Sequence, residues 1–225
     1  MYVLSVIEDE VALHPSEFGP NAHIPAIRRI IEGKYVDRVI PDVGLVVGLY
    51  DVLKVTDAYI FPGDLKDSQG DAACTVVFRL MVFRPQVGEL LIGRVLASTP
   101  MGLQISLGGF FQDVSVPITH LRKPCEYDAR SKAWVWKYQA SPGVAEVPYP
   151  YLQDELICVC VKSVQFIDSL DGSLTAARRA EALSTPVVPA HASAEEQAVE
   201  HTPHPPMLIV ASVEDDGMGL LNWWV

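Results

Sequence analysis

Residues 87–121, "VGELLIGRVLASTPMGLQISLGGFFQDVSVPITHL", decide the fold of the second half of this 225-residue chain. Short runs in which apolar and polar residues alternate are typical of half-buried strands. Gly93 falls in the middle of the first run, where a sharply coiled strand favours a residue without a side chain. Gly102 falls at the first hairpin turn, and Gly108 and Gly109 lead into the next strand. This spacing predicts a small barrel of tightly coiled strands.

The same kind of pattern continues to about residue 168. Five β-rich runs separated by turns favour a small closed, all-β barrel. These runs are "ELLIGRVLAS", "GLQISL", "DVSVPI", "AWVWKY" and "ELICVCVKSVQFI". Residues 169–206 are rich in Ala, Pro and Glu and poor in bulky apolar residues, so we expect a flexible insert there. "MLIVASV" then returns as a barrel-associated strand, which makes residues 86–225 one barrel domain with an insert.

Residues 1–85 mix the periods of strands and helices. The segments "YVLSVIEDEVAL", "DVGLVVGLYDVLKV" and "CTVVFRLMVF" predict strands, and glycines inside the second indicate bulges or close backbone contacts. "IPAIRRIIEG" predicts a short helix with Pro25 in its first turn and Gly33 at its end. A helix packed on a mostly antiparallel sheet predicts an α+β domain. One face of the third strand is wholly apolar, and it consists of Cys74, Val76, Phe78, Leu80 and Val82.

The charge of the chain limits what it can bind. It has 17 basic and 28 acidic residues, a formal net charge of −11 and a pI of about 4.9. Because binding to phosphates depends on Lys and Arg, any contact with nucleic acid must be local or weak. The acidic residues in "MYVLSVIEDE" argue against a signal peptide, and no apolar run is long enough to span a bilayer. We therefore expect no membrane partner, and reduced, packed thiols at Cys74, Cys125, Cys158 and Cys160.

Motifs for catalysis are missing from the sequence. It contains no GxxxxGK[ST] phosphate-binding loop, no GxSxG nucleophile elbow and no HExxH zinc motif. His201 and His204 form an HxxH pair, but they lie in the predicted insert, where nothing would hold the geometry of a metal site. The acidic runs at residues 8–10 and 214–216 fall at a strand edge and a turn, where solvated charge is the usual explanation. We expect no active site, metal or cofactor in this chain.

Residues 88–121 resemble an S1-type oligonucleotide-binding (OB) domain. S1 domains that hold single-stranded RNA usually carry aromatic residues beside the hairpin glycine and a histidine on the third strand. Here Met101, Gln104 and Pro117 take those places, so the base stacking that such rings provide is missing. Other residues of the barrel region remain as candidates for RNA contact, and these are Arg94, Phe110, Phe111, Arg122, Lys123 and Trp136. The alternative interpretation is that the charged ones are ordinary surface residues and the aromatic ones belong to the barrel core.

The two halves together resemble one family, the larger subunit of the two-subunit stalk of archaeal and eukaryotic RNA polymerases. The resemblance rests on "DVGLVVGLYDV", "DAYIFPGD" and "VVFRLMVFRPQVGELLIGRV". "WVWKY" and the ending "GLLNWWV" are most similar to the RNA polymerase III branch. Two alternatives stay open: the same architecture in polymerase II, polymerase I or an archaeal polymerase, and a free S1-type RNA-binding protein.

This resemblance implies a fold and a set of partners. The first domain would be a truncated, RNP-like tip that docks on core subunits of the polymerase. The smaller stalk subunit would pack along the junction of the two domains, forming a heterodimer, and the barrel would face emerging RNA and initiation factors. The protein would be a non-catalytic nuclear subunit that acts in initiation and clamp closure. The tip residues implied in core docking are Phe61, Pro62, Gly63 and Asp64, although "FPGD" could also be a plain hairpin turn.

The chain ends with half of its four tryptophans. We expect the last residues to dock as a terminal plug, because tryptophan is rarely left exposed without a reason. Adjacent tryptophans point to opposite sides, so one ring should pack on the barrel and the other should meet a neighbouring surface such as the partner subunit. The plug residues are Leu220, Leu221, Trp223 and Trp224.

Overall fold

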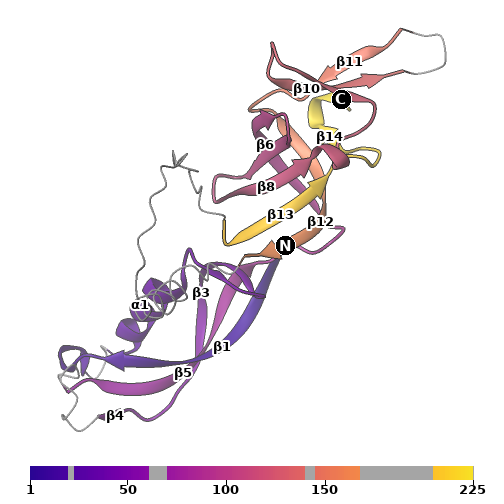
Figure 1. Ribbon diagram of the computed structural model, residues 1–225. Helices are drawn as coiled ribbons and strands as arrows, with labels where there is room; N and C mark the ends of the chain where they lie inside the picture. Colours follow the sequence, from indigo (N-terminus) through magenta and orange to yellow (C-terminus); the bar gives the residue numbers. More distant parts are fainter. Residues whose placement is uncertain (20–22, 61–69, 140–144, 168–204, 225) are drawn as a thin grey trace, which may run out of the picture.

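Two large sheets follow one another along an elongated molecule, and a smaller sheet extends beyond the second (Figure 1). The structure is a computed structural model and describes residues 1–19, 23–60, 70–139, 145–167 and 205–224. The N-terminus lies between the two large sheets, and the C-terminus lies at the far end of the second (Figure 1). No described helix is long and apolar enough to cross a membrane.

The first sheet is built around its fifth strand, which pairs with three of the others. Its strands are β1 (Tyr2–Leu13), β2 (Val39–Ile40), β3 (Gly44–Val55), β4 (Tyr59–Ile60) and β5 (Ala72–Phe83). β1, β3 and β4 each pair antiparallel with β5. A short 3-10 helix, η1 (Pro15–Glu17), leads from β1 to α1 (His23–Tyr35), which packs on one face of the sheet. The predicted apolar face of β5 is buried in the core that the sheet shares with α1, which confirms the α+β prediction for this half.

The helix α1 runs two residues past Gly33, so the predicted end of this helix is wrong. Contacts with the sheet hold its last turn. The Lys34 ammonium lies 2.5 Å from the Asp9 carboxylate, and the Tyr35 hydroxyl donates to the same carboxylate at 2.8 Å. The Tyr35 ring also packs on Phe78, with 5.6 Å between ring centroids. Because glycine costs only about 1 kcal/mol inside a helix, these contacts outweigh its preference for an end.

Strand β3 is irregular, as its glycines predicted. Its pairing with β5 shifts register between Val46 and Gly48, and it shifts again twice before the strand ends at Val55. Each shift leaves an extra residue on β3 and increases the local twist of the strand. The sheet therefore curls, which is visible in the strong twist of β3 and β5 in Figure 1.

Five strands close the second sheet into a barrel: β6 (Leu90–Thr99), β7 (Gly102–Leu107), β8 (Phe111–Pro117), β12 (Leu156–Phe166) and β13 (Met207–Ser212). The sheet closes because β13 pairs parallel with β8 on one side and antiparallel with β12 on the other. A two-residue strand, β14 (Gly219–Leu220), adds to β12. The predicted barrel and the return of "MLIVASV" as one of its strands are confirmed. The domain division predicted between residues 85 and 86 falls in the link between β5 and β6, and it stays a prediction.

The run "AWVWKY", predicted as a barrel strand, lies outside the barrel. It forms β10 (Ala133–Tyr138), the middle strand of a separate sheet with β9 (Cys125–Asp128) and β11 (Val147–Pro150). The small barrel interior is already filled by fully buried aliphatic side chains such as Val95, Ile105 and Val159, which leaves no room for two indoles. Trp134 and Trp136 pack against this core from outside the barrel. A short helix, η2 (Ile118–His120), links β8 to this sheet.

Two of the predicted barrel glycines sit where a side chain would not fit. A Cβ atom at Gly93 would lie 2.5 Å from the Ile105 side chain on the next strand. Gly102 has a φ of +140°, and a Cβ atom there would overlap the Val116 carbonyl oxygen. These positions therefore require glycine, as the sequence spacing predicted.

The cysteines are free thiols, and the predicted insert is largely outside the described residues. Residues 168–204 are not among those that the structure describes, so the prediction of a flexible insert is not tested there. Cys158 and Cys160 lie on one face of β12, as their spacing predicted. Burial raises the pKa of the Cys74, Cys125 and Cys158 thiols, which keeps them protonated and unreactive.

Candidate interaction surfaces

The two large sheets meet at an aromatic cluster. Phe83, the last residue of β5, is fully buried and belongs to the core of the barrel as well as to the first sheet. Its ring centroid lies 5.2 Å from that of Phe110 and 5.4 Å from that of Phe111, both on the β7–β8 turn or the start of β8. Tyr2 packs on Phe83 at 5.7 Å from the other side. The cluster makes the junction a packed contact between the two sheets.

Polar contacts reinforce this junction around the N-terminus. The Met1 ammonium pairs with the Glu89 carboxylate at 2.7 Å, and the Arg84 amide donates to the Met1 carbonyl at 2.8 Å. Partial burial opposes ionisation of Glu89, but hydrogen bonds from the ammonium and from the Gln86 amide outweigh it, so the pKa of Glu89 is lowered. The start of β1 is thereby tied to the start of β6.

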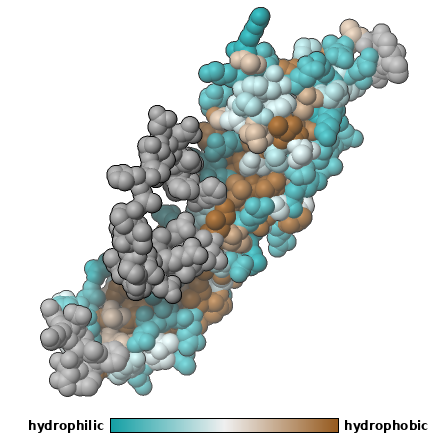
Figure 2. Space-filling model, viewed as in Figure 1, coloured by the Kyte–Doolittle hydropathy of each residue, from teal (hydrophilic) through white to brown (hydrophobic). Residues whose placement is uncertain are grey.

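Exposed apolar side chains extend across this junction, and we call them the junction face. Leu4 of β1 lies directly opposite Met81 of β5, on the sheet face that α1 does not cover. The side chains are between 39% and 62% exposed, and apolar surface is visible over the middle of the molecule in Figure 2. A group of exposed apolar side chains of this kind is unusual on a monomer and is typical of an interaction site. The junction face consists of Tyr2, Leu4, Val6, Met81, Leu90, Ile92 and Phe110.

The junction face has a signal in the sequence of β1, although its residues were not predicted as an interaction site. Over "YVLSVI" both the even and the odd positions of β1 are largely apolar. The odd positions Val3 and Ile7 pack toward α1, so the even positions need another cover. A strand that is apolar on both faces predicts that both faces are buried in the working assembly.

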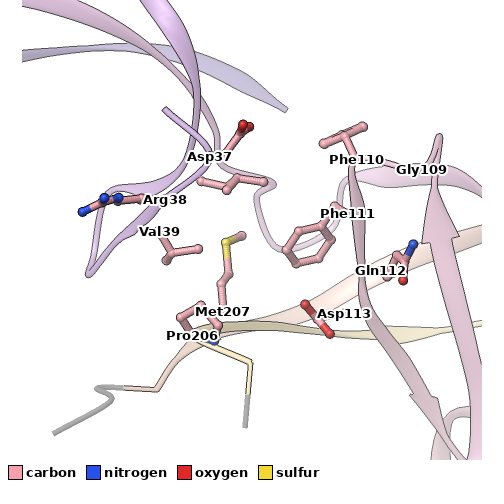
Figure 3. A pocket seen from close by; sticks show the side chains of 11 residues that line it. Asp37, Arg38, Val39, Gly109, Phe110, Phe111, Gln112, Asp113, Pro206 and Met207 are labelled. Atoms are coloured by element: carbon pink, nitrogen blue, oxygen red, sulfur yellow. The ribbon is translucent and has the colours of Figure 1, made fainter. Parts of the chain in front are cut away.

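A pocket of about 620 Å³ opens at the junction. Figure 3 shows Met207 between Val39 of the first sheet and Phe111 of the barrel, with Arg38 directed away from them. Burial raises the pKa of Asp113 at the edge of this pocket. An apolar floor with a partly desolvated carboxylate suits an apolar side chain of a partner better than a phosphate.

The predicted core-docking residues Phe61, Pro62, Gly63 and Asp64 lie outside the described residues, so their role stays a prediction. The chain enters that segment from β4, at the end of the molecule farthest from the barrel (Figure 1). Ile60 is 62% exposed there, and Phe18 is 46% exposed. A pocket of about 520 Å³ lies between them and α1.

The residues predicted to contact RNA lie at three separate places. Arg94 is exposed on β6, where its guanidinium donates to the Asp154 carbonyl. Phe111 and Trp136 are only 5% and 6% exposed, so neither offers a free ring face for a base. Phe110 belongs to the junction face, and the remaining two candidates, Arg122 and Lys123, lie before β9 near the C-terminus. The structure therefore does not gather these residues into one surface.

The C-terminal segment packs against the β9–β10–β11 sheet. Leu220 is fully buried in the barrel core and is followed by the short helix η3 (Leu221–Trp223). The Trp223 ring lies 4.7 Å from Tyr151 and 5.6 Å from Trp136, measured between centroids. Trp224 is 48% exposed. The two rings thus have different environments, and contact of the second ring with a neighbouring protein stays a prediction.

Arg122 holds the C-terminal segment in place through ring contacts and hydrogen bonds. Its guanidinium lies 4.7 Å from the Trp136 ring centroid and 5.7 Å from that of Trp224. It also donates to the Asp216 carboxylate and, at 3.1 Å, to the Asp215 carbonyl. Stacking and ion pairing together hold the last turn of the chain against β10.

The acidic runs have structural partners in the described part of the chain. Partial burial disfavours the charge on Asp9, but hydrogen bonds from Lys34 and Tyr35 outweigh it, so the pKa of Asp9 is lowered. Asp215 lies 3.5 Å from Lys162, and Asp216 pairs with Arg122. No group of three or more His, Cys, Asp or Glu side chains that could hold a metal occurs among the described residues, which exclude His201 and His204.

Comparison with known proteins identifies the family. Residues 89–224 match the profile of "RNA polymerase III subunit Rpc25", and residues 8–64 match an SHS2 domain found in the N terminus of Rpb7p and Rpc25p. A DNA-directed RNA polymerase III subunit RPC8 of Bos taurus is 33% identical over 100% of this chain and 98% of its own length. The subunits of the same name from Schizosaccharomyces pombe and Saccharomyces cerevisiae are 30% and 31% identical, over 100% of both chains. The chain therefore belongs to the Rpc25 family, the larger stalk subunits of RNA polymerase III.

Proposed function

We propose that this protein is a non-catalytic subunit that joins the polymerase III stalk to the enzyme core and to a smaller stalk subunit. Family membership implies a polymerase III complex, a stalk heterodimer and hence a nuclear setting. The nucleotidyl-transfer chemistry would belong to other subunits. The two-part division at residues 85 and 86 would separate a tip domain for the core from a barrel domain for RNA and initiation factors.

The junction face is the observation that carries the proposal. Covering a half-exposed Leu or Ile side chain contributes on the order of 1 kcal/mol, so seven such residues can support a stable heterodimer. The face spans the first sheet and the barrel, so one partner seated there would also fix the angle between them. The smaller stalk subunit is the partner that we assign to it.

Core docking would use the opposite end of the first sheet. The segment Phe61–Asp64 follows the exposed Ile60 at that end. A Pro-Gly turn presents a stiff knob with an apolar anchor, which suits insertion into a groove. A stalk held at its tip and extended by its barrel would be able to influence closure of the clamp.

Contact with RNA would be weak. Met101 is 77% exposed at the tip of the β6–β7 hairpin, and Gln104 is exposed on the outer face of β7. Neither side chain is a ring on which a base could stack. The net charge of −11 also opposes binding of phosphates. We therefore expect the barrel to bind protein partners at least as much as it binds RNA.

The test compares two substitutions on the junction face with one elsewhere. Val6→Asp and Ile92→Asp replace side chains that are 62% and 61% exposed, so the chain should still fold. In cells, each tagged variant should recover at least tenfold less of the smaller stalk subunit than the unchanged chain, because a buried unpaired carboxylate costs several kcal/mol. The control Met101→Asp, at an apolar side chain that is still more exposed, should recover it normally. Equal recovery by all three variants would refute this interface.

A further inference from the structure

A row of exposed side chains on β3 lies beside the junction face. The pairing of β3 with β5 skips one β3 residue at each of its three register shifts, and the skipped residues are Val47, Tyr50 and Leu53. All three are apolar or aromatic, and they are 38%, 54% and 50% exposed. Each bulge therefore adds one exposed side chain of this kind to the strand. We call these three residues the bulge row.

The bulge row borders an open edge of the first sheet. β2 pairs with β3 only at Gly44 and Leu45, so from Val47 onward no other strand among the described residues lies beside this edge. Successive bulges interrupt the regular hydrogen-bond pattern that an added strand would need. A partner at this edge must therefore bind through side chains on the face of the sheet, and not by extending the sheet.

An ion pair connects the bulge row to the junction face. Arg79 of β5 lies opposite Val6 of β1 on one side and opposite Asp51 of β3 on the other. Its Nε donates to the Asp51 carboxylate at 2.7 Å, and its Nη2 donates to the second carboxylate oxygen. The guanidinium carbon also lies 5.0 Å from the centre of the Tyr50 ring. Because Tyr50 and Asp51 both contact Arg79, they lie on the sheet face that α1 does not cover.

The surroundings of this ion pair are apolar. Val6 is 62% exposed on one side of Arg79, and Met81, two residues further along β5, is 39% exposed on the same face. The side chains of Arg79 and Asp51 are 34% and 32% exposed. A bidentate pair holds both charged groups in a fixed position. An apolar partner can cover a pair that is closed within its own chain without leaving either charge unpaired.

We propose that the Arg79–Asp51 pair and Tyr50 lie inside the interface with the smaller stalk subunit, because the bulge row and the junction face are continuous across this pair. This footprint rests on the stalk function proposed above, and it extends the contact of the partner from β1 and β5 to β3. The partner supplies apolar side chains over Val47, Tyr50 and the aliphatic part of Arg79. It supplies no carboxylate to Arg79, since two nitrogens of the guanidinium already bond to Asp51.

The test is a double-mutant cycle in the assembled heterodimer. The tagged full chain is co-expressed with the smaller stalk subunit, and the amount of that subunit recovered with the tag is measured. Asp51→Leu and Arg79→Met each leave one charge of the pair without its partner, so each should lower recovery at least about tenfold. The double variant should recover the subunit to within about twofold of the unchanged chain, because apolar side chains of similar size can replace a buried ion pair.

A matched control breaks an ion pair elsewhere. Lys137 and Glu126 lie 2.6 Å apart on the small sheet at the far end of the barrel, and Glu126→Leu should leave recovery unchanged. Thermal unfolding of each variant without the partner should have nearly the same midpoint as that of the unchanged chain, since a partly exposed ion pair contributes little to folding. A loss of recovery with an unchanged midpoint then reports the interface and not the fold.

The outcomes distinguish this footprint from the stalk function itself. If Ile92→Asp on the barrel lowers recovery and Asp51→Leu does not, the heterodimer stands and the footprint on β3 is wrong. If neither variant lowers recovery, the proposed function fails together with the footprint. Equal losses in the single and double variants would overturn the role of the closed pair. Higher recovery with Asp51→Leu would do so as well, because Arg79 would then be pairing with a carboxylate of the partner.

Discussion

Replacing Phe83 by alanine should destabilise the barrel, although Phe83 lies on a strand of the first sheet. The side chain is fully buried and belongs to the barrel core. Truncating a buried Phe to Ala costs about 3–5 kcal/mol, and each aromatic pair that is lost adds roughly 0.5–1.5 kcal/mol beyond burial. Phe83 has such pairs with Tyr2, Phe110 and Phe111. We therefore expect the free energy of unfolding to fall by an amount near the upper end of the range of about 3–5 kcal/mol.

Tryptophan fluorescence during urea unfolding measures this effect. All four tryptophans lie between residues 134 and 224, so the signal reports the barrel and its attached sheet and not the first sheet. Phe83→Ala should lower the midpoint of this transition, and Phe83→Leu should restore most of it. Phe78→Ala is the matched control, because Phe78 is equally buried but belongs only to the core under α1. If Phe83→Ala moved the tryptophan transition by less than Phe78→Ala did, the shared core inferred here would be wrong.

Three further changes test other contacts. Gly102→Ala should cost at least about 2 kcal/mol in thermal unfolding, because φ is +140° and the new Cβ atom overlaps the Val116 carbonyl; a melting temperature equal to that of the unchanged chain would contradict this. The pKa of Asp9 is lowered by its bonds to Lys34 and Tyr35, so its ionised form stabilises the fold at neutral pH and this contribution disappears as the pH falls below about 4. Urea unfolding at pH 5 and pH 2 should therefore show a larger loss for the unchanged chain than for Asp9→Asn, and equal losses would exclude the effect. Deleting residues 222–225 should cost about 3 kcal/mol or more in urea unfolding, since it removes a packed tryptophan; unchanged stability together with unchanged partner binding would rule out a terminal plug.

Local chemistry explains why the barrel was predictable. Between Leu90 and Pro117 apolar and polar residues largely alternate, and two glycines occupy positions with a steric reason, Gly93 inside β6 and Gly102 at the turn into β7. Register and turn position follow from such a pattern without knowledge of distant residues. The end of α1 was misplaced for the opposite reason, because the contacts of Tyr35 with β1 and β5 are not visible in the helical segment.

The strand "AWVWKY" shows where sequence reasoning fails for the barrel. Its composition is as β-like as that of any barrel strand, and only the volume of the barrel interior excludes it. That volume depends on β13, which pairs with β8 and β12 although it lies about 90 and 45 residues away from them in the sequence. A strand count alone could not decide which five of the six β-rich runs close the barrel.

The candidate site was the hardest part to predict, because a binding surface shows in a sequence only when it breaks the pattern of the fold. In β1 the pattern does break, since Leu4 and Val6 are apolar where a strand with one solvated face should be polar. The strand becomes acidic from Glu8 onward on the same face, so the apolar part stops about halfway along the sheet. A partner that covered the whole sheet would leave Glu8 and Glu10 buried, whereas one seated at the junction buries only the apolar half. If the proposed interface is right, the change from Val6 to Glu8 marks its border, and substitution of Glu8 by leucine should leave recovery of the smaller subunit unchanged.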